Sequence, residues 1–221
     1  MCIKTYYRIA MGRAIKRIFD FLLACFLFLP GVLVLLCGML FVKIVSPESS
    51  PVFRQTRVGY KNKIFTLYKL RSMTNEKDAE GNLLPDELRL KKWGMIIRKT
   101  NMDELFQIWN ILKGDMSFIG PRPLLPEEMK VMTASEQDER QSMRPGITGW
   151  EAVHEGESKT RREMAMLDLY YVRNWSIKLD WLVFFRTISI VLGFRRPDDS
   201  VRAPKMTEDQ IIDENVRDSQ E

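Results

Sequence analysis

FLLACFLFLPGVLVLLCGMLFV, residues 21–42, contains no charged side chain in 22 positions. As a straight α-helix it would be about 33 Å long, enough to cross the hydrocarbon core of a bilayer. The stretch is too long for the apolar region of a secretory signal, and no small-residue cleavage site follows it. Such length and uniformity are also untypical of a buried helix in a soluble domain. The sequence therefore predicts a membrane-inserted segment.

The middle of this run holds Pro30 and Gly31, and proline removes a helical hydrogen bond and clashes with the preceding turn. Basic residues stand on both sides, whereas a spanning helix concentrates them on one. These residues are Lys4, Arg8, Arg13, Lys16 and Arg17 before the run, and Lys43, Arg54, Arg57, Lys61 and Lys63 after it. We therefore predict that Pro30 breaks the helix into a re-entrant hairpin with both ends on the cytoplasmic face. The alternative is a kinked spanning helix, because such helices tolerate proline.

Composition leaves the function open but excludes several kinds of site. The chain has 221 residues, with 34 basic and 29 acidic side chains and a formal net charge of +5. This excess favours anionic partners only weakly. The three cysteines show neither metal-ligand spacing nor a disulfide framework, and the single histidine, His154, excludes any site that needs two. Chemistry must then rest on carboxylates, lysines, arginines, hydroxyls or a metal.

The rest of the chain predicts an α/β domain, mainly helical with a small sheet. Two short strands within residues 51–73 flank a turn at Gly59–Asn62, and a polar loop follows over 74–87. The expected helices cover residues 88–98, 103–112, 127–143 and 158–172. The glycine- and proline-rich segment RPGITGW, residues 144–150, reads as a loop.

Residues 175–194 combine large apolar side chains with three charged ones. This favours an amphipathic helix at the membrane interface, with a core helix as the alternative. From residue 195 the charged sequence predicts a mobile tail. The expected organisation is a basic N-terminus and membrane hairpin over 1–45, a cytoplasmic domain with interfacial helices over 46–194, and the tail over 195–221.

Several basic residues stand in contexts that suit phosphate. Strand alternation places Lys69 and Arg71 on one face, and Arg122 lies between two prolines that restrict its backbone. A guanidinium held in this way can bind two phosphate oxygens at once. Further candidates are Arg98, Arg144 and the backbone at Gly146 and Gly149, where glycine permits close approach to a ligand.

TNMDELFQIWN, residues 100–110, places two carboxylates, Asp103 and Glu104, before an apolar helical pattern. One interpretation is structural, since Asn101 and Glu104 have the spacing of a capping box. The other is chemical, since Mg²⁺ binds one or two carboxylates plus phosphate oxygens, and an aspartate can attack phosphorus. The residues alone therefore lead to a membrane-attached, Mg²⁺-assisted enzyme of phosphoryl groups, beside the alternative of surface arginines and helix-capping acids.

A series of motifs in a fixed order resembles the bacterial sugar transferase family, the monotopic polyprenyl-phosphate phosphoglycosyl transferases. The motifs are KRIFD (16–20), the proline-containing apolar run, KLRSM (69–73), MDELFQIWNILKGDMSFIGPRP (102–123), RPGITGW (144–150) and LDLYYVRNWS (167–176). Together they cover roughly residues 14–194. Without a large N-terminal extension, the chain looks like the short members that contain only the catalytic domain, and most like those that start N-glycan or surface-glycan assembly.

The resemblance implies transfer of a sugar-1-phosphate from a UDP-sugar to polyprenyl (undecaprenyl) phosphate, with release of UMP. An N-acetylated aminosugar is the expected sugar. The expected location is the bacterial cytoplasmic membrane, with the catalytic domain on the cytoplasmic face. The implied partners are these two substrates and membrane lipids, and not nucleic acid. A homodimer and contacts with downstream glycosyltransferases stay open.

The resemblance also assigns roles to the carboxylates. Asp103 is expected to attack the β-phosphorus and form a covalent phosphosugar intermediate, which the polyprenyl phosphate then attacks. Glu104 would assist proton transfer or metal positioning, and both side chains would bind Mg²⁺. Asp168 matches an acidic position of the family whose role is open.

The remaining implied roles concern the substrate and the membrane. Arg122, Lys69 and Arg98 would bind substrate phosphate. The expected nucleotide and substrate loop contains Arg144, Gly146 and Thr148, with Asp168 grouped beside it. Pro30 would be the break in the membrane helix.

The chain departs from the family pattern at three points. Phe106 stands where proline often follows the DEL triplet, and Leu29 replaces the serine that often precedes Pro30. Residues 151–153 read Glu-Ala-Val where many relatives have Ala-Gln-Val, which could change substrate preference. Two rival functions stay open: a membrane-bound phosphohydrolase that uses the same dyad, and a non-catalytic membrane scaffold of a glycan-assembly pathway.

Overall fold

A computed structural model describes residues 3–154 and 160–193. The tail predicted over 195–221 lies outside the described residues. The elements, in chain order, are α1 (Ile3–Val45), β1 (Val52–Val58), η1 (Tyr60–Asn62), β2 (Ile64–Leu70), α2 (Asp86–Arg89), α3 (Lys92–Lys99), η2 (Met102–Phe106), α4 (Gln107–Lys113), β3 (Ser117–Ile119), η3 (Pro126–Val131), α5 (Ala134–Arg140), β4 (Gly146–Thr148), α6 (Trp150–Val153), α7 (Arg161–Arg173) and α8 (Ile177–Val191). The α/β class, mainly helical with little sheet, is confirmed.

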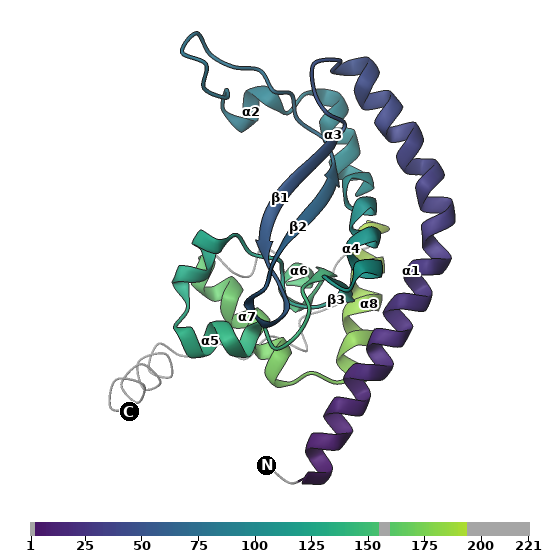
Figure 1. Ribbon diagram of the computed structural model, residues 1–221, viewed down its shortest axis with the longest axis vertical. Helices are drawn as coiled ribbons and strands as arrows, with labels where there is room; N and C mark the ends of the chain where they lie inside the picture. The colour runs from purple at the N-terminus through teal and green to yellow at the C-terminus, as the bar shows by residue number, and fades with distance from the viewer. Residues whose placement is uncertain (1–2, 155–159, 194–221) are drawn as a thin grey trace.

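The long helix α1 is continuous from Ile3 to Val45 and contains Pro30. Figure 1 shows it as one bowed helix along the edge of the domain. The prediction that Pro30 breaks this segment into a hairpin is therefore wrong. Proline removes only one hydrogen bond, and a helix can relieve the clash of its ring by bending. The expectation that both ends lie on one membrane face rested on that break.

Contacts on both sides of Pro30 explain why α1 stays in one piece. Ala24, before the proline, and Val42, after it, are both fully buried. Ala24 belongs to an apolar cluster with residues of β2 and α4, while Val42 packs in a second cluster with Leu70. A Cβ on Gly38 would lie 2.9 Å from Leu70 Cδ2, so the second half of α1 lies directly against the end of β2.

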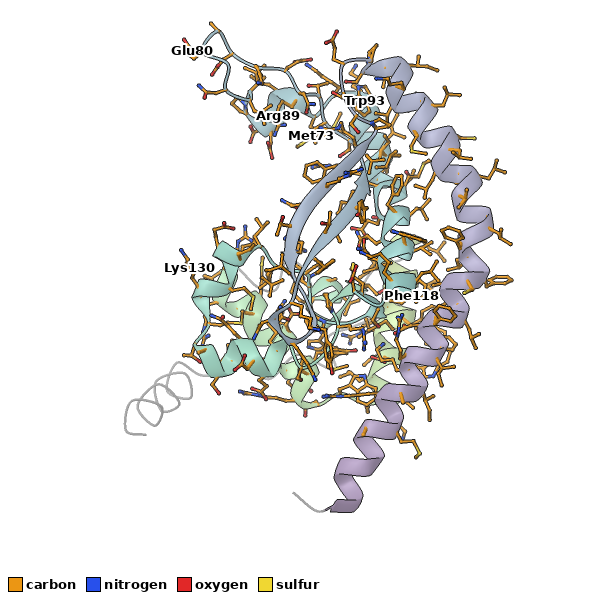
Figure 2. All side chains as sticks on the ribbon, viewed as in Figure 1. Met73, Glu80, Arg89, Trp93, Phe118 and Lys130 are labelled. Carbon is orange, nitrogen blue, oxygen red and sulfur yellow. The ribbon has the colours of Figure 1, made fainter. Side chains whose placement is uncertain are left out.

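The outer side of α1 is apolar and exposed. Within Ala10–Val45 an 18-residue window has a mean hydropathy of 2.7, and 11% of that window is buried inside the protein. Length and composition therefore suffice for a membrane crossing, and this degree of burial is untypical of a soluble core helix. Figure 2 shows side chains projecting from the outer edge of α1, and Trp93 near its C-terminal end, where its ring centroid lies 6.5 Å from that of Phe41.

A β-hairpin forms the centre of the domain, as the sequence predicts. β1 and β2 are antiparallel, with Val52 opposite Leu70 and Val58 opposite Ile64. Asn110 of α4 attaches the helix to the hairpin, because its side-chain amide donates to the Thr66 carbonyl at 2.7 Å. Phe65 and Leu67 of β2 pack with Ala24 and with apolar residues of α4, so the hairpin and α1 enclose α4.

A second, parallel pair joins β3 to β4, with Ser117 opposite Gly146 and Ile119 opposite Thr148. The prediction of a loop over residues 144–150 is therefore wrong for its middle three residues. The two backbones approach closely, since a Cβ on Gly146 would lie 2.2 Å from the Gly120 nitrogen. Gly146 is thus required for the contact between these segments.

Three predicted helices are divided in the structure. Residues 88–98 contain the end of α2 and most of α3, with a break at residues 90–91. Residues 103–112 form the 3₁₀ turns of η2 followed by α4, and residues 127–143 are divided into η3 and α5. Thr133 starts α5 as a true capping box, because its hydroxyl accepts from the Glu136 N–H and the Glu136 carboxylate accepts from the Thr133 N–H. The chain therefore stops one helix and starts another at Thr133.

The helix α8 exposes aromatic side chains, as expected for an interfacial helix. Trp181, Phe184 and Phe185 have ring centroids within 5.5–5.8 Å of one another and are 49%, 38% and 62% exposed. Its buried side carries Asp180, which accepts from the Tyr171 hydroxyl at 2.6 Å. This arrangement supports the interfacial interpretation, and contact with a membrane stays a prediction.

Candidate functional site

The two candidate catalytic carboxylates lie on the short turn η2, between α3 and α4. Asn101, just before it, has a left-handed backbone with φ 54° and makes no side-chain cap. The predicted capping box between Asn101 and Glu104 is therefore wrong. An N-cap needs an extended backbone, whereas asparagine in the left-handed region is typical of the residue that ends a helix. Asn101 closes α3, which leaves Glu104 free for other contacts.

Lys69 of β2 joins both carboxylates. Its ammonium nitrogen lies 3.3 Å from Glu104 Oε1 and 3.7 Å from Asp103 Oδ2. Asp103 is 8% exposed, while the Glu104 and Lys69 side chains are 32% and 28% exposed. The structure therefore brings together three of the predicted site residues in one partly open cluster, which we call the Lys69–dyad cluster.

Arg98 lies at the end of α3 and contacts the segment after β2. Its Nε donates to Ser72 Oγ at 3.0 Å. The residue is exposed, and Ser72 is buried. Within residues 3–154 and 160–193, no hydrogen bond or ion pair joins the Arg98 side chain to Asp103 or Glu104. Its role as a phosphate ligand stays a prediction.

Arg122 is held mainly by its backbone, and its guanidinium makes one longer ion pair, with Glu151. Its N–H donates to both carboxylate oxygens of Asp168 at 3.3 and 3.2 Å, and its carbonyl accepts from Arg140. Arg140 and Asp168 form an ion pair in which the side chains are 0% and 2% exposed. We call these three residues the Arg122 clamp. The Arg122 side chain itself is 55% exposed and remains available to a ligand.

The clamp indicates a role for Asp168. Burial raises the pKa of the Asp168 carboxyl, and the charge and hydrogen bonds of Arg140 oppose that rise. The Asp168 carboxylate is buried, and its Oδ2 accepts from both the Arg122 N–H and the Arg140 guanidinium, while Oδ1 accepts only from the same N–H, at 3.3 Å. That Asp168 positions Arg122 and does not contact substrate stays a prediction.

Sequence reasoning missed Arg140 and undervalued Glu151. Arg140 stands among other charged residues of α5, and nothing in that pattern indicates that it is fully buried. Glu151 is 2% exposed, and its Oε2 lies 3.7 Å from Arg122 Nη1. Its departure from the family pattern was the available signal. The position lies beside a predicted phosphate ligand, and its effect on substrate preference stays a prediction.

The predicted nucleotide loop is packed rather than free. Arg144 Nε donates to the Gly114 carbonyl at 2.8 Å, and its guanidinium lies 4.8 Å from the Tyr60 ring centroid. Gly146 lies against Gly120, as described above. The Thr148 hydroxyl lies 2.8 Å from that of Thr187 on α8. Among the described residues, no hydrogen bond or ion pair joins Arg144 to the Lys69–dyad cluster.

The dyad offers few ligands to a metal ion. Among the described residues, no group of three or more histidine, cysteine, aspartate or glutamate side chains could hold one. The donor set is therefore two neighbouring carboxylates. This fits Mg²⁺, which commonly takes one or two carboxylates and completes its shell with water and substrate phosphate. It does not fit a structural zinc site, which needs four protein ligands.

Known proteins resemble this chain over most of its length. The sequence model described as bacterial sugar transferase matches residues 11–194. EpsL of Bacillus subtilis (strain 168), described as an uncharacterized sugar transferase, is 44% identical over 80% of this chain and 87% of its own length. An undecaprenyl-phosphate N-acetylgalactosaminephosphotransferase of Aeromonas hydrophila is 38% identical over 81% of this chain and 44% of its own.

A third relative is the UDP-glucose:undecaprenyl-phosphate glucose-1-phosphate transferase of Escherichia coli (strain K12). It is 36% identical over 80% of this chain and 40% of its own length. The chain thus spans most of EpsL but less than half of the other two proteins. The matched residues contain the Lys69–dyad cluster, the Arg122 clamp and most of α1. The chain belongs to the bacterial sugar transferase family.

Proposed function

We propose that this enzyme transfers a sugar-1-phosphate from a UDP-sugar to undecaprenyl phosphate and releases UMP. The observation that carries the proposal is the Lys69–dyad cluster, in which a lysine ammonium lies 3.3 and 3.7 Å from two adjacent carboxylates in a partly open site. Relatives whose names describe such transfers support it. The alternative of a non-catalytic scaffold is disfavoured by family membership.

The proposed reaction has two displacements at one phosphorus. An Asp103 oxygen attacks the β-phosphorus, the bond from that phosphorus to the bridging oxygen breaks, and UMP leaves with the electron pair. A phosphate oxygen of undecaprenyl phosphate then attacks the same phosphorus, and the Asp103 carboxylate leaves. Each step makes one P–O bond and breaks one, so no external oxidant or reductant is needed. Asp103 is therefore regenerated after each turnover.

Lys69 and Glu104 act around this nucleophile in the proposal. The Lys69 ammonium balances negative charge as the diphosphate arrives. Asp103 and Glu104 would hold Mg²⁺, which when bound neutralises phosphate charge and polarises the leaving phosphate. Arg122 offers an exposed guanidinium whose backbone is already fixed, so little ordering is needed when it binds phosphate.

The remaining parts of the proposal concern the acceptor and the sugar. The exposed apolar side of α1 and the aromatic side chains of α8 would place the domain at the cytoplasmic face of the inner membrane, where a polyprenyl phosphate is available. The proposed sugar is an N-acetylated aminosugar. The Aeromonas relative is named for N-acetylgalactosamine, whereas others are named for glucose or galactose.

A single-turnover experiment tests the central step. The purified chain is incubated with UDP-N-acetylglucosamine or UDP-N-acetylgalactosamine and Mg²⁺, without any acceptor, and its peptides are analysed by mass spectrometry. We expect a sugar-phosphate adduct on Asp103 that disappears when undecaprenyl phosphate is added. Release of free sugar phosphate to water, without a lipid-linked product, would instead identify a phosphohydrolase.

A further inference from the structure

A cavity separate from the Lys69–dyad cluster lies between α1, the turn η1 and the segment before β4. Its volume is about 70 Å³. It is lined by Arg13, Lys16, Arg17, Asp20, Tyr60, Ser117, Ser142, Met143 and Arg144. Four of these side chains are cationic and one is acidic. On the same volume scale, one water molecule takes about 10–15 Å³. The cavity can therefore hold a group of about five heavy atoms.

The cations of this cavity are only partly compensated by the protein. Lys16 pairs with Asp180 at 3.0 Å. Arg17 donates to the Ile111 carbonyl at 2.7 Å, and Arg144 donates to the Gly114 carbonyl. Both guanidiniums thus end at the C-terminus of α4, whose partial negative charge compensates less than one full charge.

Among these cations, Arg13 is the one with a buried donor that lacks a hydrogen-bond acceptor. Its Nη1 donates to the Ser142 carbonyl at a long 3.4 Å. Its Nε is buried and has no hydrogen-bond partner. A buried donor without an acceptor is costly, and the cost is larger for a charged group. Within the lining, Arg13, Arg17 and Arg144 then face one carboxylate, Asp20, which already accepts from the Ser117 hydroxyl at 2.8 Å. Asp115 adds partial compensation for Arg17 from outside the lining.

We propose that this cavity binds a phosphate group. A tetrahedral oxyanion matches the size of the cavity, supplies an acceptor to Arg13, and compensates the excess of guanidinium charge. Ser142 and Tyr60 add further polar groups to its lining. Arg144 is shared with the predicted substrate loop, but the dyad is not part of the lining, so this is a second site.

The position of the cavity indicates where the phosphate comes from. Arg13 and Arg17 lie on α1 just before the uncharged run that starts at residue 21. Between and beside them, Ile15, Ile18 and Phe19 are 50%, 60% and 55% exposed. Cations at the end of an apolar segment commonly lie at the level of lipid phosphates. The headgroup of an anionic lipid and a free phosphate share this chemistry, and the experiment separates them.

The test uses the full chain in a neutral detergent and measures binding without turnover. The probes are dihexanoyl phosphatidylglycerol, dihexanoyl phosphatidylcholine and inorganic phosphate, and the readouts are bound stoichiometry by native mass spectrometry and the ligand-dependent rise of the melting temperature. We expect one phosphatidylglycerol bound in preference to phosphatidylcholine. Binding of inorganic phosphate with equal affinity would assign the site to a free phosphate instead of a lipid.

Two variants locate the binding in this cavity. Arg13→Gln removes the unpaired donor's charge and should weaken binding by roughly fivefold or more. Ser142→Asp places a carboxylate in the lining, removes no native side-chain hydrogen bond, and should weaken binding by roughly tenfold. Lys43→Gln, at the other end of α1, removes the same charge and should leave affinity unchanged.

The inference is overturned if the wild type binds neither phosphatidylglycerol above the phosphatidylcholine level nor inorganic phosphate. It is also overturned if both cavity variants bind as tightly as the wild type. Should Arg13→Gln not fold, Ser142→Asp decides alone. Because no nucleotide sugar is present, these outcomes are independent of whether the transfer reaction proposed above is correct.

Discussion

Asp103 and Asp168 are both largely buried aspartates of one domain, yet their surroundings differ. Asp168 is 2% exposed and accepts from a backbone amide and from the guanidinium of Arg140. Asp103 is 8% exposed, and its Oδ2 lies 3.7 Å from the ammonium nitrogen of Lys69. The first carboxylate is closed off from solvent in a buried ion pair, whereas the second borders a partly open cluster. The difference separates a positioning residue from a candidate nucleophile, although both match motifs of the same family.

The contrast also shows how the two regions depend on each other. The Arg122 clamp fixes a backbone so that an exposed guanidinium can meet phosphate, while the Lys69–dyad cluster leaves its reactive oxygens accessible. Ion pairs in the first region should therefore govern stability and geometry. Those in the second should govern chemistry with little effect on stability.

The largest effect is expected for Asp103→Asn. The change removes the proposed nucleophile and should lower turnover by at least about 10³-fold. The free energy of unfolding should stay within about 1 kcal/mol of the wild type, because the amide keeps the size of the carboxylate and no short ion pair is lost. UMP release and denaturant unfolding in the same detergent measure the two quantities.

Asp86→Asn is the matched control, since Asp86 is an exposed aspartate whose partner is Arg89. It should change neither turnover nor stability. An Asp103→Asn protein with normal turnover would remove Asp103 from the mechanism, and one that is strongly destabilised would erase the contrast with Asp168.

The next effect concerns stability at the Arg122 clamp. Arg140→Ala leaves Asp168 buried without its cation and should lower the free energy of unfolding by about 3–5 kcal/mol. Lys91→Ala, which breaks the exposed pair between Lys91 and Glu76, is the control and should cost less than about 1 kcal/mol. An equal loss of unfolding free energy in Arg140→Ala and Lys91→Ala would contradict the burial of the Arg122 clamp.

A double variant separates positioning from folding. Arg140→Met combined with Asp168→Leu removes both buried charges and should regain much of the lost stability. In this double variant the Arg122 N–H and carbonyl lack their partners. We therefore expect turnover below that of the wild type even where stability is regained. Full recovery of turnover together with stability would show that the clamp has no positioning role.

The sequence predicted the elements that depend on local pattern. The alternation around Lys69 predicted which side chains share one face of β2, and the apolar run predicted the long helix α1. The hairpin at Pro30 was wrong because tertiary packing of Ala24 and Val42 holds both halves of the helix in line. Local rules describe what proline disfavours, but they do not include the contacts that compensate.

The candidate site was predictable only where its residues are close in sequence or follow a family motif. Asp103, Glu104 and Lys69 came from such motifs and meet in space. Arg140 could not be found, because its burial depends on Asp168, 28 positions away along the chain. The capping box at Asn101 failed for a related reason, since its spacing is correct but the left-handed backbone belongs to the end of α3.

A smaller effect on activity is expected from changing Lys69, the cation beside Asp103 in the Lys69–dyad cluster. Lys69→Met removes the cation beside both carboxylates and should lower kcat/KM by roughly 10- to 100-fold with little loss of stability. Lys69→Arg keeps the charge in a different geometry and should restore part of the activity. Lys63→Met, which removes an exposed lysine just before the same strand, is the control. Wild-type kcat/KM in Lys69→Met would show that the carboxylates work without this cation.

The smallest effect tests Glu136, an ionised carboxylate with a purely structural setting. Its oxygens accept from Arg162 at 2.6 Å and from the Thr133 N–H at 2.7 Å. Burial raises the pKa of Glu136, but the hydrogen bonds and charge of Arg162 and the Thr133 N–H outweigh it, so the net shift is downward. Its ionised form therefore stabilises the fold above the unfolded-state pKa, about 4.3, and this contribution is lost as the pH falls through the lower folded-state pKa.

Glu136→Gln should accordingly cost about 1 kcal/mol of unfolding free energy at pH 7, because the amide oxygen can still cap Thr133 while the charge and one of the two oxygens that accept from Arg162 are lost. The difference from the wild type should hold between pH 8 and about pH 5 and shrink below about pH 4. Urea unfolding across this range measures it, with turnover at pH 7 as a second readout that should not change. A cost that is independent of pH would mean that Glu136 acts through shape and hydrogen bonding alone. Glu136 would then resemble Asp168, whose pKa is raised because burial outweighs the charge and hydrogen bonds of Arg140, so that its charge does not by itself stabilise the fold.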